Sequence, residues 1–237
     1  MEAPVDWSAR LRKLDAEEWA PVVEAASGLP GPRANLRLVA AAAAIAGARE
    51  IDALLRSGSE FATMCAAAAI ARRAADSQEQ ARARDLACDG RWRVREGVAI
   101  GLQLWGDVEP NAMAEVATMW ARDAHPLVQR AAVAAICEPR LLTSPREAAR
   151  AVAVCATATE SVRSLSTDRR RDPDVRTLRQ TLGYGWSVAV ASDPAPGLAA
   201  FHALALDDPD VAWIVRENRA KKRLAVLLTP SPPHEHA

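Results

Sequence analysis

The sequence predicts an all-α protein, arranged as a right-handed α-solenoid of about six helix pairs. Alanine, the residue with the highest helix propensity, supplies 53 of the 237 residues. Residues that favour strands are scarce, and the chain has one Tyr and two Phe. A similar short sequence motif, called the phrase below, opens four helical stretches. The valines with which it begins the apolar stripe of each helix are about 34, 47 and 36 residues apart. That spacing is typical of proteins built from stacked helical pairs.

The N-terminal part is predicted to contribute two helix pairs, beginning with the helix at Asp15, and the helices within about residues 1–30 are expected to cap the solenoid. Asp15 and Glu18 have the spacing of a capping box at a helix start. A turn rich in Pro and Gly follows at 29–33. Helices are predicted over the next three apolar or alanine-rich stretches, which are 35–46, about 50–57 and 60–74.

Four phrases open the second helices of the later pairs, and they begin at Asp89, Asp123, Asp172 and Asp208. We expect each Asp to be a helix N-cap, because its carboxylate accepts hydrogen bonds from N–H groups of the first turn. Each phrase leads into an apolar stripe that we predict to be buried: Val94, Val98, Leu102 and Trp105; Val128, Ala132, Ala135 and Ile136; Val175, Leu178 and Leu182; Val211, Ile214 and Val215. A further helix is predicted before each phrase, over about 78–87, 110–122, 145–166 and 196–206.

The domain prediction follows from the repeats, because such pairs bury their faces only against neighbouring pairs. Residues 1–229 are expected to be a single solenoid domain, with 230–237 as a flexible tail. The apolar run Leu38–Ala48 is too short to span a membrane. The N-terminus lacks the basic start and apolar stretch of a signal peptide. We therefore expect a cytoplasmic protein that makes no contact with a membrane.

Composition narrows the classes of function. The chain has 30 basic and 30 acidic side chains, and no domain-sized part of it is basic. A nucleic-acid binder usually has a basic patch, so this balance weakens that class, although a solenoid can separate charge between its two faces. The four cysteines form no CxxC pair and are expected to be reduced core thiols. No common catalytic, cofactor-binding or metal-binding motif is present, so we expect no cofactor and no metal.

The Asp-x-x-Val-Arg phrases and alanine-rich helices resemble HEAT repeats, which belong to the ARM-type α-solenoid superfamily. The stretches 89–107, 129–142 and 208–224 are similar to those of bacterial HEAT-like-repeat proteins, and the resemblance covers about 30–225. It implies a binding scaffold. One related class, the HEAT-like alkylpurine DNA glycosylases, is enzymatic and carries Trp residues and a catalytic Asp on the concave face. No complete motif of that class occurs here, so the resemblance assigns no catalytic residue.

Two clusters are candidate binding sites. The first is the densest mixture of cations with an aromatic ring, and it consists of Arg91, Trp92, Arg93, Arg95 and Glu96. Guanidinium groups suit bidentate anion contacts and stacking. The alternative is that Trp92 packs at a helix start and the arginines are solvated. The second lies in the basic block of the C-terminal helix and consists of Trp213, Arg216 and Arg219. The alternative there is a capping helix with a polar outer face.

Other positions have two interpretations each. Arg95, Arg130 and Arg176 recur in the phrases, either as anion contacts or as a ladder of ion pairs to Asp89, Asp123 and Asp172 of neighbouring phrases. The Gly183–Trp186 segment is predicted to interrupt a helix, either as a kink that presents Tyr184 for stacking or as a bend or close helix crossing.

Two positions are assigned roles in packing. Gly97 and Gly101 are expected to allow two helices to approach closely. Asn218 falls on an apolar stripe, so we predict that it hydrogen-bonds the backbone of the preceding repeat.

The function predicted from the sequence is a non-catalytic scaffold that binds a protein, or another macromolecule, on its concave face. The alternative is a DNA-repair glycosylase that excises alkylated purines, with DNA held by the same arginines and Asp107 or Asp123 near the lesion. The close Trp–Asp pairs, Trp105 with Asp107 and Trp120 with Asp123, belong to that alternative. A protein partner is favoured over a nucleic acid, and the sequence gives no indication of the oligomeric state.

Overall fold

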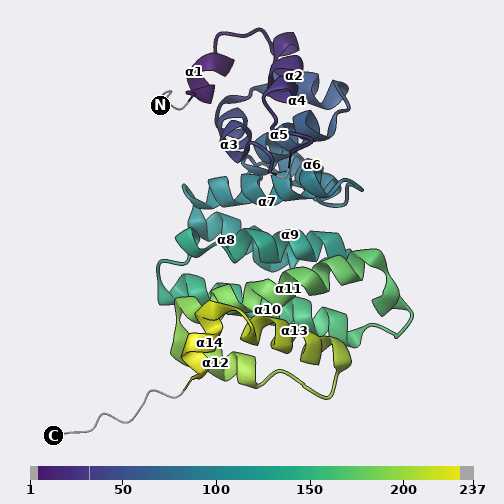
Figure 1. The fold of residues 1–237 in the computed structure, drawn as a ribbon, viewed down its shortest axis with the longest axis vertical. Helices are drawn as coiled ribbons and strands as arrows, with labels where there is room; N and C mark the ends of the chain where they lie inside the picture. Colours follow the sequence, from purple (N-terminus) through teal and green to yellow (C-terminus); the bar gives the residue numbers. More distant parts are fainter. Residues whose placement is uncertain (1–4, 32, 230–237) are drawn as a thin grey trace, which may run out of the picture. The chain divides into compact units, whose positions relative to one another are not determined.

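The computed structural model describes residues 5–31 and 33–229 (Figure 1). Within these residues the chain forms fourteen α-helices and two short 3-10 helices, without a β-strand. The predicted all-α class is therefore confirmed. The chain divides into two compact units, Met1–Glu115 and Val116–Ala237, which are described separately as the first and second unit. The single domain over 1–229 stays a prediction, and the tail at 230–237 lies outside the described residues.

The first unit contains helices α1 to α7, and α8 (Pro110–Trp120) runs across the boundary between the units. The helices of the first unit are α1 (Trp7–Leu11), α2 (Ala16–Ala25), α3 (Leu36–Ile45), α4 (Ala48–Arg56), α5 (Glu60–Ala71), α6 (Ser77–Ala87) and α7 (Trp92–Gly106). The predicted capping box is confirmed, because Glu18 accepts a hydrogen bond from the Asp15 N–H at 2.9 Å. Helix α1 is too short to show a helical period in the sequence.

Helix α5 is the centre of the first unit. Every residue from Phe61 to Ala71 is buried, as expected for a helix that is apolar on all sides. Helix α7 lies against it, with Gly97 over the carbonyl of Met64 and Gly101 over the carbonyl of Ala68. A methyl group at either glycine would overlap these backbone atoms. The predicted close approach of two helices is therefore confirmed, and it is an approach of backbone to backbone.

The second unit contains α9 (Pro126–Ile136), α10 (Pro145–Ser164), α11 (Pro173–Ser192), α12 (Pro194–His202), α13 (Pro209–Arg219) and α14 (Lys222–Leu228), with 3-10 helices at Pro139–Leu141 and Arg169–Arg171. Helix α11 packs against α9 and α13, and α10 packs against α12. In the first unit α5 packs in the same way against α3 and α7. Contacts between every second helix are compatible with an α-solenoid. The predicted apolar stripes of α7, α9, α11 and α13 are all buried.

The four phrases share one turn. The carboxylate of Asp89, Asp123, Asp172 or Asp208 accepts a hydrogen bond from the N–H two residues later, at 2.8 to 3.0 Å. Asp172 and Asp208 are N-caps as predicted. The prediction is wrong for the other two, because the helix there begins two residues later, with Arg91 and His125 as N-caps. In those phrases the aspartate fixes the turn before the helix.

Two predictions about the end of the chain need correction. The basic block was expected in a single helix, but α13 ends at Arg219 and α14 begins at Lys222. The Gly183–Trp186 segment does not interrupt a helix, because α11 continues through it. The glycines there serve a close helix crossing: a Cβ at Gly183 would lie 2.9 Å from the Trp213 ring, and one at Gly185 would lie 2.8 Å from Val133. Packing offsets the low helix propensity of glycine.

Asn218 is fully buried on α13 and connects that helix to α11. Its Oδ1 accepts a hydrogen bond from the Ser187 N–H at 2.8 Å, and its Nδ2 donates to the carbonyls of Leu182 and Ile214 at 2.8 and 2.7 Å. The predicted bond to the backbone of the preceding repeat is confirmed.

Substitution of Gly101 by Ala should destabilise the protein, because the added methyl overlaps the Ala68 carbonyl of α5. We expect the free energy of unfolding to fall by about 1–3 kcal/mol, despite the higher helix propensity of Ala. The matched control is Gly90→Ala, since a Cβ at Gly90 meets no atom within 4 Å. Urea denaturation of both variants measures the difference. Equal stability of the two variants would contradict the packing described here.

The variant Asn218→Leu should lose about 1–3 kcal/mol of unfolding free energy, because buried backbone groups of α11 lose their hydrogen-bond partners. The exposed neighbour Arg219→Gln should change it by less than about 0.5 kcal/mol. Thermal and urea unfolding followed by circular dichroism measure both. A fully stable Asn218→Leu protein would show that the amide contributes nothing to the joining of the two helices.

Candidate binding site

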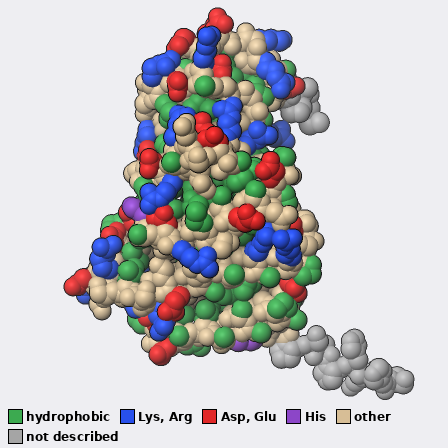
Figure 2. Space-filling model, turned by 180° about the vertical axis from the view of Figure 1, so that it is seen from behind, with side chains coloured by type: hydrophobic (Ala, Val, Ile, Leu, Met, Phe, Trp, Pro, Cys, Tyr) green, Lys and Arg blue, Asp and Glu red, His purple; other side chains and the backbone are tan. Residues whose placement is uncertain are grey.

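A pocket of about 620 Å³ opens in the second unit, between α10, α11, α12 and the start of α13. Most of its lining is apolar: Ala156, Trp186, Ala200, Ala203, Leu204, Ala205 and Val211, with Thr159, Glu160 and Arg163 as the polar members. On the face seen in Figure 2, hydrophobic side chains gather in the part of this unit near the C-terminal end of the chain. Small alanine side chains leave the space that larger residues would fill.

The polar groups in the floor of the pocket have hydrogen-bond partners. Trp186 is fully buried, and its Nε1 donates a hydrogen bond to the Thr159 hydroxyl at 3.0 Å. That hydroxyl donates in turn to the carbonyl of Cys155 at 2.7 Å. The ring of Phe201 lies 5.7 Å from the Trp186 ring, centroid to centroid, in a tilted arrangement. The floor therefore presents an apolar surface to whatever enters.

The rim of the pocket carries an ion pair. Both oxygens of Glu160 accept hydrogen bonds from the Arg163 guanidinium, at 2.7 and 2.8 Å, one turn apart on α10. The hydrogen bond from Arg163 is the main reason that the pKa of Glu160 lies below its ordinary value. Both groups are thus charged at neutral pH. They lie at the surface, with 60% of the Glu160 side chain exposed, so water remains available to both.

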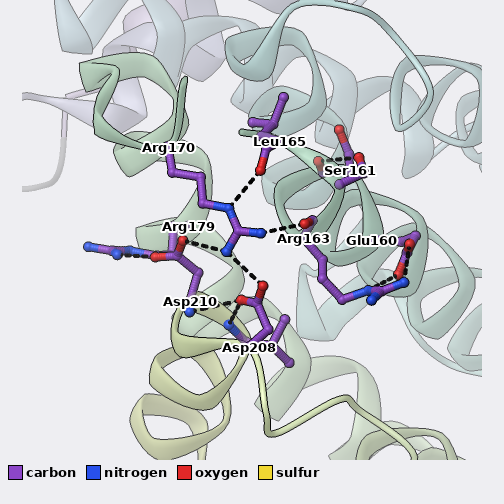
Figure 3. Close-up of polar contacts among 10 residues, drawn as sticks. Glu160, Ser161, Arg163, Leu165, Arg170, Arg179, Asp208 and Asp210 are labelled. Atoms are coloured by element: carbon purple, nitrogen blue, oxygen red, sulfur yellow. Dashed lines mark hydrogen bonds and ion pairs between the residues drawn. The ribbon is translucent and has the colours of Figure 1, made fainter. Parts of the chain in front are cut away.

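Arg170 connects the two helix ends beside the pocket (Figure 3). Its guanidinium donates to the carbonyls of Arg163 and Leu165 at the C-terminal end of α10. It also donates to Asp208 at 2.6 Å and to Asp210 at 3.3 Å, at the start of α13. The carbonyls at the end of a helix lack partners within the helix, and so do the N–H groups at its start. One arginine and one aspartate therefore satisfy both ends.

Asp208 and Asp210 extend this network to α11. The Asp208 carboxylate is partly buried, which raises its pKa, but hydrogen bonds from the Val211 N–H and from Arg170 lower the pKa further than burial raises it. Asp208 is therefore ionised at neutral pH. Asp210 accepts a second, short hydrogen bond from Arg179, as Figure 3 shows. The start of α13 is held from two sides by arginines.

The second predicted cluster lies partly beside this network. Trp213 packs over Gly183, and the Arg179 guanidinium stacks on its ring at 4.8 Å from the centroid. Arg216 and Arg219 are exposed on α13. The Arg216 side chain is 68% exposed, and its Nε lies 3.7 Å from Glu217, which makes a weak surface ion pair. The structure thus places Trp213 in a packing role and leaves the two arginines at the surface.

The first predicted cluster lies in the first unit, at the start of α7. Arg91 binds Asp89 at 2.8 Å and donates to the carbonyl of Gly58, which lies just before α5. The hydrogen bond from Arg91 is the main cause of the lowered pKa of Asp89. Arg93 binds Glu60 at 3.3 Å and stacks on Trp92 at 4.6 Å from the ring centroid.

The remaining members of this cluster complete the same turn. Arg95 donates to the carbonyls of Asp89 and Gly90, and Glu96 is half-buried on α7. Trp92 itself is 51% exposed, so it does not pack into the core. Arg91 and Arg93 hold the start of α7 against the start of α5. These arginines are therefore bound to groups of this chain, which differs from the stated alternative that they are solvated.

The ladder of ion pairs through Arg95, Arg130 and Arg176 stays a prediction. Arg95 donates to carbonyls of its own phrase. Arg170 and Arg179, which were not part of the predicted ladder, bind the aspartates of the following phrase. The run of three arginines at 169–171 was the sign of this network in the sequence. Because the run lies far along the chain from the fourth phrase, its pairing with the aspartates of that phrase could not be predicted. The pocket itself was not predicted, because alanine in a helix gives no sign of whether it lines a cavity.

The features of the glycosylase alternative have the following geometry. Trp105 and Trp120 are buried, so neither ring offers a surface on which an extruded base could stack. Asp123 fixes the turn before α9.

Among residues 5–31 and 33–229, no three His, Cys, Asp or Glu side chains are grouped as a metal site requires. No helix in that part of the chain has the length and apolar character needed to cross a membrane.

The variant Asp208→Asn should be less stable than the wild type by about 1–3 kcal/mol at pH 7, because Arg170 loses its charged partner. Since the folded-state pKa of Asp208 is lowered, its contribution is present at neutral pH and is lost as the pH falls below about 4. The difference between the two proteins should therefore shrink below that pH. Urea denaturation at several pH values measures it, with the exposed Asp168→Asn as control. A difference that does not depend on pH would contradict the role of the charge.

Comparison with known proteins adds no relative: no family model, curated protein or solved structure matches the chain. The resemblance to HEAT repeats therefore rests on the phrases in the sequence.

Proposed function

We propose that this chain is a cytoplasmic, non-catalytic binding scaffold, built as a right-handed α-solenoid of about six HEAT-like helix pairs, that recognises a protein partner. The observation that carries the proposal is the pocket of the second unit, with its apolar lining and its charged rim. Sites that bind another molecule are typically concave and mostly apolar, with a few polar groups that fix orientation. The pocket has this composition.

The pocket suits side chains of a polypeptide. Its volume of about 620 Å³ accommodates one or two large apolar side chains. Leu206, which directly follows the pocket residue Ala205, is 57% exposed and extends the apolar surface. Glu160 and Arg163 at the rim provide an acceptor and donors for the polar groups that flank such a side chain.

The pairing of arginines favours a protein scaffold over the glycosylase alternative. Of the arginines that this alternative assigned to DNA, Arg91 and Arg93 bind carboxylates of this chain and are engaged in its own structure. Arg170 and Arg179 are paired in the same way. Phosphate contacts would have to compete with these pairs. A duplex that carries one cationic methylated purine tests the alternative: binding that weakens as salt rises, together with release of the base, would establish the glycosylase.

The proposal is tested by selecting peptides from a displayed random library on the immobilised protein. We expect enriched peptides with a large apolar residue, and the variant Ala203→Trp should bind them about tenfold more weakly or worse, because the indole occupies the pocket. Ala203 is exposed at the end of α12 in an ordinary helical conformation, so the substitution leaves the core unchanged. Fluorescence anisotropy with the selected peptides measures the affinity.

The matched control is Ala153→Trp, at an exposed position on α10 that does not line the pocket. It should bind the selected peptides as the wild type does. Peptides that bind the wild type and Ala203→Trp equally would show that the pocket is not the binding site. Failure to enrich any peptide would refute the proposal that this surface recognises a polypeptide.

A further inference from the structure

Exposed cations of the second unit lie on α13 and α14, which both pack against α11. Between Trp213 and Arg223 the chain has five cations and one acid, Glu217. Arg216, Arg219 and Lys222 are exposed. The three helices pack against one another, so these charges lie on adjoining elements of one unit. We call the exposed side chains of Tyr184, Arg216, Arg219 and Lys222, together with the half-buried Arg223, the basic patch.

Two aromatic rings hold arginines in place around this patch. The Arg223 guanidinium stacks on Tyr184 at 5.0 Å from the ring centroid and donates a hydrogen bond to its hydroxyl at 2.7 Å. Arg179 stacks on Trp213 in the same manner, at 4.8 Å. A guanidinium that lies on an aromatic ring keeps donors at its edge and loses less conformational entropy when it binds a planar anion. Arg223 is therefore oriented before any partner arrives.

Tyr184 and Trp186 lie two positions apart on α11, which separates their directions by about 200° around the helix. Trp186 is fully buried and forms the pocket floor, whereas Tyr184 is 45% exposed. The basic patch and the pocket are consequently different surfaces of the unit. Binding at the basic patch is therefore independent of the function proposed for the pocket.

We propose that the basic patch binds an acidic segment of a partner polypeptide, with its carboxylates on the edges of Arg216, Arg219 and Arg223. Arginine binds carboxylates through pairs of parallel hydrogen bonds, and a planar carboxylate matches the edge of the stacked Arg223. Glu217, at 3.7 Å from Arg216, is the only acid within the basic block and is held weakly. A partner carboxylate with better geometry can displace it.

The arrangement fits carboxylates better than a nucleic acid. Single-stranded nucleic acids bind aromatic rings by stacking bases on open faces. Here the face of Tyr184 is occupied by Arg223, and the face of Trp213 is occupied by Arg179. The charge of the surrounding chain is also balanced, with about 11 cations and 10 acids over 151–237. A long phosphate backbone would leave the patch and meet those acids, whereas a short acidic peptide needs only the patch.

The test uses the full chain and a short fluorescent poly-glutamate peptide, with anisotropy measured at low and at physiological salt. We expect binding that weakens as salt rises. The double variant R216Q/R219Q should bind about tenfold more weakly. The control R169Q/R171Q removes the same charge from exposed arginines of the same unit and should bind as the wild type does. Tyr184→Phe keeps the ring but removes the hydroxyl that orients Arg223, so it should weaken binding by a few-fold.

Three results would overturn the inference. The first is the absence of binding at low salt. The second is an equal loss in the two double variants, which would indicate general attraction by charge. The third is tighter binding of a single-stranded oligonucleotide of the same charge, which would favour a nucleic acid. The variant Ala203→Trp separates this surface from the pocket, because it should bind poly-glutamate as the wild type does even if the peptide selection on the pocket fails.

Discussion

The close approach of helices at glycines is the constraint on which the rest of the structure depends. Helix α7 rests on the backbone of α5 where Gly97 and Gly101 carry no side chain, and at Gly183 and Gly185 of α11 the space of a side chain is taken by side chains of neighbouring helices. Contacts this close leave no room for even one methyl group. The positions of these glycines therefore fix how each helix is placed along and around its neighbour. The turn at Arg91 and the pocket floor at Trp186 are positioned by these contacts.

The ends of the helices are held by polar interactions of a recurring kind. An aspartate closes the turn before each of α7, α9, α11 and α13, and at α7 and α13 an arginine joins that turn to an adjacent helix end. Arg170 is the fullest case, because it satisfies two carbonyls of one helix and two aspartates of another. Much of the high arginine content is accordingly used inside the fold. Those cations have carboxylate partners already, which separates them from the exposed arginines of α13.

Helix α11 organises both proposed binding surfaces. Its buried side carries Trp186 and the Ser187 N–H that donates a hydrogen bond to Asn218, and its exposed side carries Tyr184. The two glycines that flank Tyr184 bring the helix close to its neighbours on both sides. The Tyr184 ring and the Trp186 indole therefore lie on different sides of the unit, although both belong to one turn of α11. A single short segment thus contributes to a pocket for apolar side chains and to a patch for carboxylates.

The sequence by itself determined the helical class, the apolar stripes, the close glycine contact of α7 and the buried amide of Asn218, because each follows from local propensity and from the period of a helix. It did not determine the N-caps at Arg91 and His125, the course of α11 through its glycines, the partners of Arg170 or the alanine-lined pocket. Those features depend on which distant segment of the chain lies alongside. A glycine in a helix is stabilised by packing against the neighbouring helix that its lack of a side chain allows to come close. An alanine borders a cavity only where the facing side chain is also small. Such pairings were decided by the tertiary structure, since they join residues about 30 to 50 positions apart.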